Sequence, residues 1–554
     1  MVERASITDI ANEVRTGLRR NRVVFLVGAG VSMLGPSALP SGPALKRRVI
    51  DSIANGSQFG HEWRCIRRRI RFHRIVPEII FQRIYEHLGE RLYGFFQLLD
   101  GGTPNEAHYW LAHCSSEYRA VLITTNFDVL LERAGARGSN VLHAHGSIDV
   151  PAEMVFRINR VGLGLATPLT RDIRALVRGR TLCILGYSGL DKDVIDAVNA
   201  ARPRRVLWLA RNRADVVFQS AERLKCSSIS VGIGDLQRLV KRIRTGRLCA
   251  SQEQVSQPRS RAAAVERWKK SLSSDERFAA MSAVLFELGE YAAAARVAMA
   301  GVRLRSHERV QRAWFYRQAA NAMKVEGQFE KALALATCVR RLKAATRYDV
   351  AAAWNAVGLV HLEKDRYNIR LARLAFTRAA GEFRWIRRNS VRTNQREQVE
   401  ALRGRVYNNL GLALSHEGEL GLAMEAFRRS LAVKRRTGDL IGKAQTAANV
   451  SIAYYREREF ASAALWRGRA LSLMMRYDLD FEKAYLLRQT GALACQQGRS
   501  NLGLRLLRQA LDLYRSLPAA RFGTTLTTRI IRQYTAKPAS KQASQAISLK
   551  TKSL

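Results

Sequence analysis

The spacing of hydrophobic and polar positions follows two different patterns along the chain, and the pattern changes near residue 246. From about Asn21 to Ser230, short apolar runs alternate with helical stretches; the runs are RVVFLVGAG, AVLITTNFD, NVLHAHGS, TLCILGYSG and RVLWLAR. This alternation predicts a parallel sheet with helices on both faces, in a Rossmann-like α/β domain. Every run ends in small or polar residues. Because ligands bind at the carboxyl ends of strands in open α/β sheets, these ends predict one shared site.

The second half of the chain is predicted to be all helical and repetitive. Gly411, Ser451 and Gly491 lie 40 residues apart, and each starts a similar pattern of a turn followed by small residues. Related segments occur upstream, the last with an apparent insertion after its turn: FELGEYAAAARVAMAGV, VEGQFEKALALATCV and AWNAVGLVHLEKDRYNIRLARLAF. The pattern resembles the tetratricopeptide repeat, in about six units, although the step exceeds the usual length of about 34 residues. Longer helices or loops are therefore expected.

These patterns predict an α/β domain followed by an all-α helical-repeat solenoid. At 554 residues the chain is too long for a single core. The expected parts are a nucleotide-binding domain over 1–250, a polar linker over 251–274, repeats over 275–520, and a C-terminal extension with a basic tail over 521–554. The tail, AKPASKQASQAISLKTKSL, is predicted to be disordered.

The formal net charge of +45 raises the question of a polyanionic partner. The basic residues are spread along the whole chain, and a preference for Arg codons would produce the same composition. Two stretches combine Arg with aromatic residues: WRCIRRRIRFHR over 63–74 and FRWIRRNSVRTNQR over 383–396. Both also fit solvated faces of amphipathic helices. Nucleic acid binding is therefore an open alternative that the sequence does not favour.

Cysteine usage and the terminal sequence predict a cytoplasmic protein. The seven cysteines are scattered and never form a CxxC pair, which is typical of reduced thiols. The first residues lack the apolar core of a signal peptide, and no run is long enough to span a bilayer. We expect no membrane partner and no metal.

Four clusters at predicted strand ends are candidates for chemistry, and each alone has a plain structural explanation. They are GAGVS over 28–32, TTNFD over 124–128, HAHGS over 143–147 and GYSGLD over 186–191. Glycines after a strand let backbone N–H groups approach a pyrophosphate at a helix start, or simply form a tight turn. Asn126 and Asp128 can point into a crevice or cap a helix. His143 and His145 lie on one strand face, and either can be a structural histidine.

In this order, the four motifs resemble the sirtuin family in its divergent bacterial branch, over roughly residues 15 to 240. The resemblance implies that NAD is bound as substrate. Asn126 would orient the nicotinamide ribose or an attacking water, Asp128 would contact the nicotinamide end, and His145 would bind ribose hydroxyls and supply base character. The remaining implied NAD-binding residues lie in the same motifs: Gly28, Ala29, Gly30, Ser32, Thr125, Gly186, Ser188 and Asp191.

Departures from the family pattern narrow the expected chemistry. Deacylases of the family carry a zinc module with two CxxC pairs, which this chain lacks, and MLGPSALPSGPALKRR stands where they have a GIPDFR-like segment. The expected reaction is therefore NAD+ hydrolysis to nicotinamide and ADP-ribose, with hydrolase and cyclase outcomes both open. A non-catalytic NAD or ADP-ribose sensor and a zinc-free deacylase are the alternatives.

The attached repeats imply control of such an enzyme by a partner. Helical solenoids usually bind protein segments or assemble subunits, and an uncontrolled NAD hydrolase would harm its own cell. In divergent bacterial relatives with this layout, the resemblance implies inducible antiphage defence by depletion of NAD. A protein trigger is therefore expected at the repeats, while homo-oligomerisation stays open.

Overall fold

The structure is a computed structural model that divides into two compact units. It describes residues 2–55, 59–69, 75–189, 191–211, 214–243, 260–304, 309–343, 345–363, 368–386, 393–476, 479–517 and 521–535. The first unit comprises 1–52, 76–81 and 90–272, and the second comprises 53–75, 82–89 and 273–554. The division thus runs through helix α4 (Pro77–Leu88), whose two halves belong to different units.

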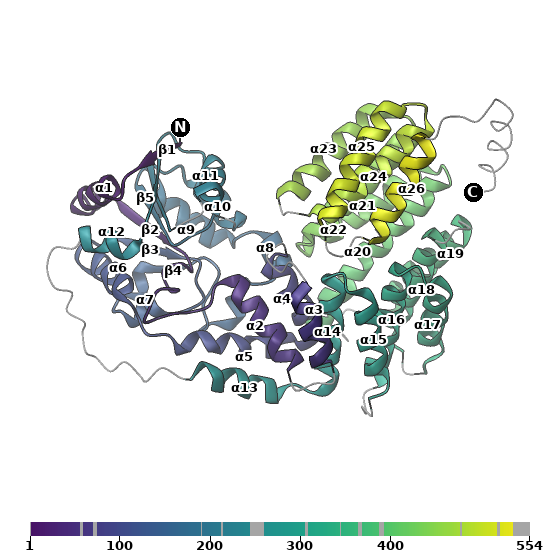
Figure 1. Cartoon of the computed structure of the whole chain (residues 1–554), viewed down its shortest axis with the longest axis horizontal. Coiled ribbons are helices and arrows are strands. Elements are labelled where there is room, and N and C mark those ends of the chain that lie inside the picture. Colours follow the sequence, from purple (N-terminus) through teal and green to yellow (C-terminus); the bar gives the residue numbers. More distant parts are fainter. Residues whose placement is uncertain are drawn as a thin grey trace. The chain divides into compact units, whose positions relative to one another are not determined.

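The first unit contains a parallel sheet of seven strands in the order β1-β7-β6-β5-β2-β3-β4 (Figure 1). Their bounds are β1 Val2–Ala5, β2 Val23–Val27, β3 Val121–Thr124, β4 Val141–His143, β5 Thr181–Leu185, β6 Arg205–Ala210 and β7 Ile229–Ile233. From β2 the chain adds β3 and β4 on one side, and then β5, β6 and β7 on the other. This is the doubly wound order, and the direction reverses between β2 and β5.

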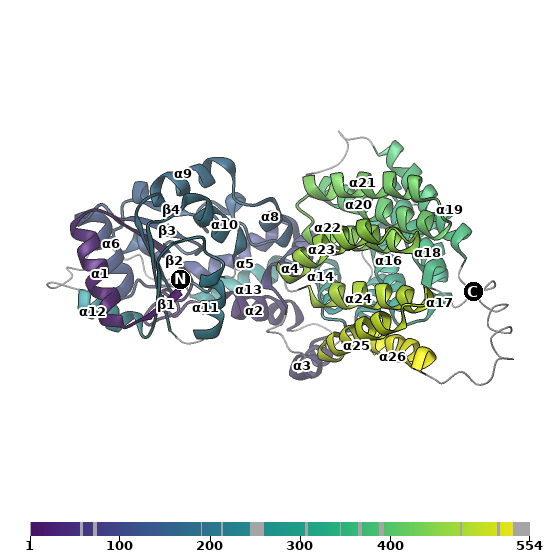
Figure 2. The ribbon, with the colours of Figure 1, turned by 90° about the horizontal axis from the view of Figure 1, so that it is seen from above.

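The central strands are apolar on both faces because helices cover both faces. All of β2 is buried, as expected for a parallel strand inside two layers. One core packs Phe25 and Leu122 against helices α1, α6 and α12, and the other packs Val24 and Trp208 against α9, α10 and α11 (Figure 2). The predicted Rossmann-like architecture is confirmed. Strands β1 and β7 were not among the five predicted runs, because β1 precedes the region where the alternation is visible and β7 begins at its end.

Helices of the first unit vary widely in length. Their bounds are α1 Ile7–Arg19, α2 Gly42–Ala54 (which ends in the second unit), η2 Gly89–Leu92, α5 Tyr93–Phe96, η3 Gln97–Gly101, α6 Glu106–Glu117, α7 Leu130–Arg133, η4 Gly138–Asn140, η5 Pro151–Glu153, α8 Ile158–Leu163, α9 Thr167–Val177, α10 Lys192–Ala201, α11 Ala214–Glu222, α12 Leu236–Ile243 and α13 Arg261–Ser271. Helix α13 lies in the predicted linker, where its Trp268 is buried against Phe95. The predicted linker residues 251–259 lie outside the described residues.

The second unit is a series of paired antiparallel helices after α3 (Gly60–Arg69). Within its described residues the pairs are α14 Ser274–Glu287 with α15 Tyr291–Val302, α16 Arg309–Val325 with α17 Phe329–Arg341, α18 Arg347–Glu363 with α19 Ile369–Glu382, α20 Thr393–His416 with α21 Leu420–Arg436, α22 Leu440–Arg456 with α23 Phe460–Arg476, and α24 Asp480–Gln496 with α25 Ser500–Ser516. Helix η6 (Phe383–Trp385) follows α19, and α26 (Arg521–Thr535) packs on α25. The predicted helical repeats are confirmed.

The repeating small residues have two physical roles. A Cβ on Gly411 would lie 2.8 Å from the Phe427 ring, so the missing side chain lets paired helices approach. At the hairpin turns, Gly418 and Gly498 take left-handed φ angles of 83° and 82°, and Arg458 takes 63° at the equivalent place. Between α18 and α19, residues 364–367 lie outside the described residues, and the insertion expected after this turn stays a prediction. The predicted disordered tail over 536–554 lies outside the described residues too.

Each of the two sequence stretches considered as nucleic acid contacts buries an aromatic side chain. The Trp63 and Phe383 side chains are buried, so neither can stack on a base. Trp385 is exposed. Parts of both stretches lie outside the described residues. Within the described ranges, no helix combines the length and the apolar character needed to cross a bilayer.

Candidate functional site

The predicted motifs meet at the carboxyl ends of the parallel strands, where the order of the sheet reverses. The loop after β2 carries Gly28 and Gly30, and the neighbouring loop after β5 carries Gly186. β3 and β4 lie beyond β2 on the same sheet edge and end in the Asn126 and His145 motifs. A switch point of this kind is where doubly wound folds bind ligands.

The glycine motif brings the loop after β2 into close contact with the loop after β5. The N–H groups of Gly28 and Gly30 donate to the carbonyls of Leu185 and Gly186, at 2.9 and 2.8 Å. A Cβ on either glycine would lie 2.7 Å from the Gly186 oxygen. These two N–H groups are therefore used within the protein rather than presented to a phosphate. Residues 29–37 form turns and α2 begins at Gly42, so the expected helix start directly after the motif is wrong.

The Ser32 hydroxyl organises the first polar group of the site. The buried ring of His108 bonds through Nδ1 to the Asn105 side chain, at 2.9 Å, and through Nε2 to the Ser32 Oγ, at 3.1 Å. Burial lowers the pKa of His108 to about 3, so this ring is neutral. Ser32 Oγ also accepts from Nδ2 of Asn126, at 3.1 Å. The Ser32 side chain also interacts with the Asp128 carboxyl group and acts to lower its pKa.

This network sets the orientation of the Asn126 amide. With Nδ2 held by Ser32, Oδ1 faces away, and this buried oxygen has no hydrogen-bond partner. The backbone N–H of Asn126 donates to Thr124 Oγ1, at 3.1 Å, which braces the turn. A buried amide oxygen without a partner costs free energy, and such groups concentrate at functional sites. Asn126 therefore presents an acceptor to whatever occupies the site.

Asp128 combines a capping role with a place in this group. Its Oδ1 accepts from the backbone N–H of Leu130, at 3.2 Å, at the start of α7. Burial raises the pKa of Asp128, while the hydrogen bonds from Ser32 and Leu130 oppose that rise. The capping interpretation of Asp128 is seen in this hydrogen bond, and its contact with a ligand stays a prediction.

The two histidines of the third motif have different surroundings. His143 bonds through Nδ1 to the Asn126 carbonyl, at 3.0 Å, and through Nε2 to Glu132, at 2.8 Å. His143 therefore supports the Asn126 turn from behind. The ring of His145 bonds instead to Oδ2 of Asp193, at 3.1 Å, and both side chains are almost fully buried. Only His145 belongs to the second polar group.

The second polar group is a buried cluster of carboxyl groups around His145. Burial alone would lower the pKa of His145, but the hydrogen bond to Asp193 and the negative charges of Asp193, Asp191 and Glu78 raise it to about 9. The imidazole is therefore protonated at neutral pH. In that state it donates hydrogen bonds, and the base character that the resemblance implied would require loss of this proton.

Glu78, on α4, is a carboxyl group whose pKa lies close to neutral pH. Burial raises its pKa to about 7, with a further rise from Asp191 and an opposing effect of His145. Its Oε2 is buried and has no hydrogen-bond partner. Lys46 is also buried, and burial lowers its pKa to about 8 against the attraction of Glu78. Glu78 is thus the group of this cluster that can gain and lose a proton near pH 7.

The remaining predicted site residues line the loops around these groups. Gly186 has a left-handed φ of 61°, and its Cβ would lie 2.6 Å from the Val31 nitrogen. Ala29 and Ser188 are exposed. The backbone N–H of Thr125 donates to the Val27 carbonyl, at 3.0 Å. The carbonyl of Asp191 accepts from the Tyr187 hydroxyl, at 3.1 Å, and burial raises the pKa of the Asp191 carboxyl group.

Sequence reasoning missed Glu78, His108 and Asp193. Asp193 lies two residues after Asp191, so a wider reading of that motif would have included it. His108 and Glu78 lie inside helices α6 and α4 with no motif around them, and only the fold brings them to the strand ends. In the described part of the chain, no group of three or more His, Cys, Asp or Glu side chains is arranged to hold a metal ion.

Comparisons with known proteins name no family for this chain. No family model matches it, and no curated protein matches it. Among solved structures, it resembles the crystal structure of Rap protein complexed with competence and sporulation factor, at 11% identity and a TM-score of 0.35. The match covers 49% of this chain and 79% of that chain. A likeness at this level carries no argument about function, which must come from the site.

Proposed function

We propose that the first unit binds NAD+ at the β2–β5 switch point and cleaves the bond between nicotinamide and ribose with water. The observation that carries the proposal is the Asn126 amide, whose buried Oδ1 is held without a partner at the end of β3. An oriented neutral oxygen of this kind stabilises a positively charged ribosyl centre and positions water. The sirtuin-like order of the four motifs supports NAD+ as the substrate.

The reaction needs an acceptor for positive charge and an acceptor for a proton. As the C1′–N bond breaks, its electron pair leaves with neutral nicotinamide, and the ribose develops oxocarbenium character. Water then forms the new C1′–O bond and loses a proton. Because His145 is protonated, it serves as a donor to ribose hydroxyls, and the Glu78 carboxylate takes the proton from water. Asp128 interacts with Ser32 and so helps to position the nicotinamide end of the substrate.

The biological role follows from coupling this reaction to a trigger. NAD+ is the substrate in this proposal, and the chemistry calls for no metal. We propose that the helical repeats receive a protein trigger and that NAD+ depletion then serves antiphage defence, as the family resemblance implies. Continuous cleavage would exhaust the cellular pool, which supports control by a partner.

Nicotinamide release from purified full-length protein tests the activity. Asn126→Ala and His145→Ala are each expected to lower release at least 100-fold, because one removes the oriented oxygen and the other the ribose donor. Asn12→Ala and His113→Ala are matched controls, since both residues are exposed in the same unit. Full release by Asn126→Ala would overturn the proposal. NAD loss in cells with and without phage, for wild type and Asn126→Ala, tests the defence role.

A non-catalytic nucleotide sensor is the second candidate. It is favoured by the Gly28 and Gly30 N–H groups, which bond to the β5 loop instead of awaiting a phosphate. A sensor would bind NAD+ or ADP-ribose in calorimetry and release no nicotinamide under any condition, including phage infection. Binding that is lost in Asn126→Ala, without turnover in wild type, would decide for this candidate.

A further inference from the structure

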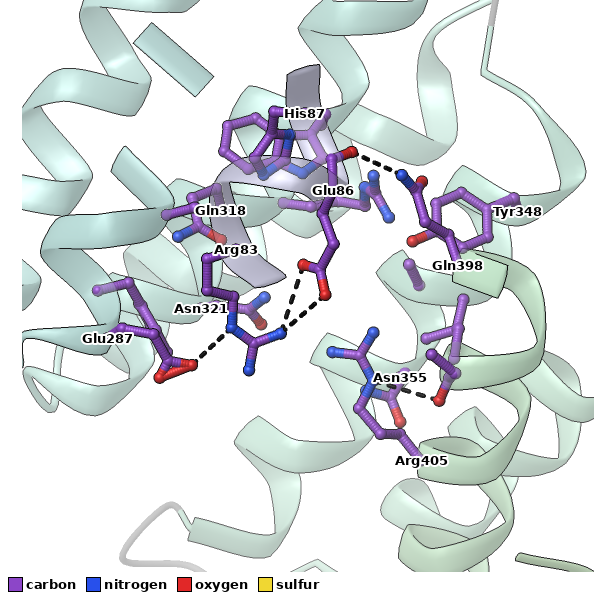
Figure 3. A pocket seen from close by; sticks show the side chains of 17 residues that line it. Arg83, Glu86, His87, Glu287, Gln318, Asn321, Tyr348, Asn355, Gln398 and Arg405 are labelled. Atoms are coloured by element: carbon purple, nitrogen blue, oxygen red, sulfur yellow. Dashed lines mark hydrogen bonds and ion pairs between the residues drawn. The ribbon is translucent and has the colours of Figure 1, made fainter. Parts of the chain in front are cut away.

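The repeats contain a polar groove that already holds a segment of this chain. The groove is lined by the first helices of four successive pairs, α14, α16, α18 and α20, together with the C-terminal half of α4 (Figure 3). That half, residues 82–89, belongs to the second unit. The groove thus has a visible occupant whose contacts show what it recognises.

Three contacts hold the α4 segment in the groove. Nε of Arg83 bonds to Oε1 of Glu287 on α14, at 2.6 Å. The His87 ring packs edge-on against the Trp314 ring on α16, with centroids 4.4 Å apart. Nε2 of Gln398, on α20, donates to the Glu86 carbonyl, at 2.7 Å (Figure 3). The groove therefore offers a carboxylate, an aromatic face and an amide donor to one turn of helix.

The charge states of Arg83 and His87 are consistent with these contacts. The carboxylates of Glu287 and Glu86 outweigh burial and raise the pKa of Arg83, so the cation is retained. Burial, with the nearby charges of Arg83 and Arg317, lowers the pKa of His87 to about 3. His87 thus acts as a neutral aromatic ring. Because Arg83 and His87 are four residues apart, both lie on one face of α4.

The segment fills the groove incompletely. A cavity of about 180 Å³ remains among the lining residues, enough for several water molecules at roughly 30 Å³ each. Arg405 and Asn355 lie on the side away from Glu287 (Figure 3). The exposed Arg405 makes one intrahelical hydrogen bond, to the Ala401 carbonyl. A ligand with an acidic group at this end would make contacts that α4 does not.

We propose that this groove is the binding site for a helical segment of a partner protein, and that residues 82–89 occupy it in the partner's absence. The partner segment carries a cationic residue for Glu287, an aromatic or imidazole ring four residues later for Trp314, and an acidic group that reaches Arg405. It displaces the α4 segment because it makes the same contacts and also fills the cavity. The two ligands compete for one surface.

Displacement has a consequence for the first unit. Helix α4 also carries Glu78, five residues before Arg83, in the buried carboxyl cluster with His145. Release of the C-terminal half frees the helix that positions Glu78, so partner binding changes the candidate active site. This consequence rests on the proposed function, whereas the groove itself does not.

Binding of the segment in trans tests the groove. The probe is a fluorescent peptide of residues 77–89, PEIIFQRIYEHLG, added to full-length protein and followed by anisotropy. Arg83→Glu in the chain weakens the binding of residues 82–89 in the groove. It is therefore expected to tighten peptide binding at least tenfold over wild type. His87→Ala is a milder second variant with the same expected direction. Arg429→Glu, at an exposed pair with Glu425 outside the groove, is the matched control and should bind like wild type.

Two further results decide the proposal. Adding Trp314→Ala to the Arg83→Glu chain should abolish the gain, and a peptide carrying Arg83→Glu should bind neither chain. Equal binding to wild type, Arg83→Glu and His87→Ala would overturn the groove assignment. Nicotinamide release is then measured in the same samples. Peptide binding that leaves an active enzyme unchanged overturns the link to Glu78, while binding with no release in any sample overturns the proposed function and leaves the groove intact.

Discussion

Two buried polar clusters, one in each unit, differ in how completely they are hydrogen bonded. In the second unit, the buried Lys434 ammonium donates to the Gly442 carbonyl at 3.0 Å and to Thr446 Oγ1 at 2.7 Å. Ser430 completes that network by bonding to the Gly404 carbonyl at 2.7 Å. At the strand ends of the first unit, the Asn126 Oδ1 and one oxygen of Glu78 are buried without partners.

A closed network of this kind stabilises the fold, whereas a buried acceptor without a partner can accept a hydrogen bond from a ligand. The Lys434 network closes on the protein's own carbonyl and hydroxyl groups, so it holds α21 and α22 together. The Asn126 and Glu78 oxygens weaken the unbound first unit, because a buried acceptor without a partner costs about 1–3 kcal/mol. Such a cost is recovered when a substrate supplies the missing contact. Four changes test the comparison.

The largest stability loss is expected where the glycine loops meet. Gly28→Ala places a Cβ 2.7 Å from the Gly186 oxygen and the Tyr187 Cα, and backbone atoms on both sides resist displacement. We expect a loss of about 3 kcal/mol in the first unit. Gly468→Ala, inside α23 with open space around its Cβ, should instead stabilise the second unit by roughly 0.5–1 kcal/mol. Hydrogen exchange, measured separately in each unit, reports both changes in stability. If Gly28→Ala changed the stability of the first unit no more than Gly468→Ala changes the second, the close approach of the two glycine loops would be contradicted.

The pH dependence of the first unit should be nearly as large. The pKa of His145 is raised to about 9 in the folded protein, above the value of about 6.5 in the unfolded chain. The resulting stabilisation, about 3 kcal/mol, is fully present below pH 6.5 and is lost as pH rises through 9. Asp193→Asn should remove most of this pH dependence. Unfolding free energies at pH 6 and pH 9.5 measure it, and identical profiles for wild type and variant would contradict the pairing.

A smaller loss is expected from opening the closed network of the second unit. Thr446→Val removes an acceptor from the Lys434 ammonium, which keeps only the Gly442 carbonyl. We expect a loss of about 2 kcal/mol, because a buried charged donor is left incompletely bonded. Lys434→Met, which removes the charge as well, should cost less than Thr446→Val. If denaturant unfolding showed a larger loss of stability for Lys434→Met than for Thr446→Val, the network would not be closed as described.

The sequence predicted the sheet and the repeats because both depend on local periodicity. The apolar runs around Val23–Val27 and Thr181–Leu185 are long enough to identify as buried strands, and the 40-residue step identifies the hairpins. The strand-end motifs placed Asn126, Asp128 and His145 at one sheet edge. The protonation of His145 could not be predicted, since it depends on Glu78 and Asp193, which only the fold brings near.

The same limit applies to the glycine motif and to α4. A glycine-rich turn after a strand has one sequence pattern whether its N–H groups bind a phosphate or a neighbouring loop, and here Leu185 and Gly186 accept them. The residues of α4 between Pro77 and Leu88 form an ordinary amphipathic pattern. That its halves belong to different units depends on contacts with Glu287 and Trp314, more than 200 residues away.

The smallest stability change is expected at Asn126, where the largest loss of activity is also expected. Asn126→Ala removes the bond to Ser32 but also removes the buried oxygen without a partner, so the two effects oppose each other. We expect the free energy of unfolding to change by less than about 1 kcal/mol. Asn408→Ala is the matched change in the second unit, since Asn408 bonds to both Asn409 and Asn449 at 3.0 Å, and it should cost more. If Asn126→Ala destabilised the protein as much as Asn408→Ala, Asn126 would be a structural residue like its counterpart, and its unpartnered oxygen would no longer support the proposed active site.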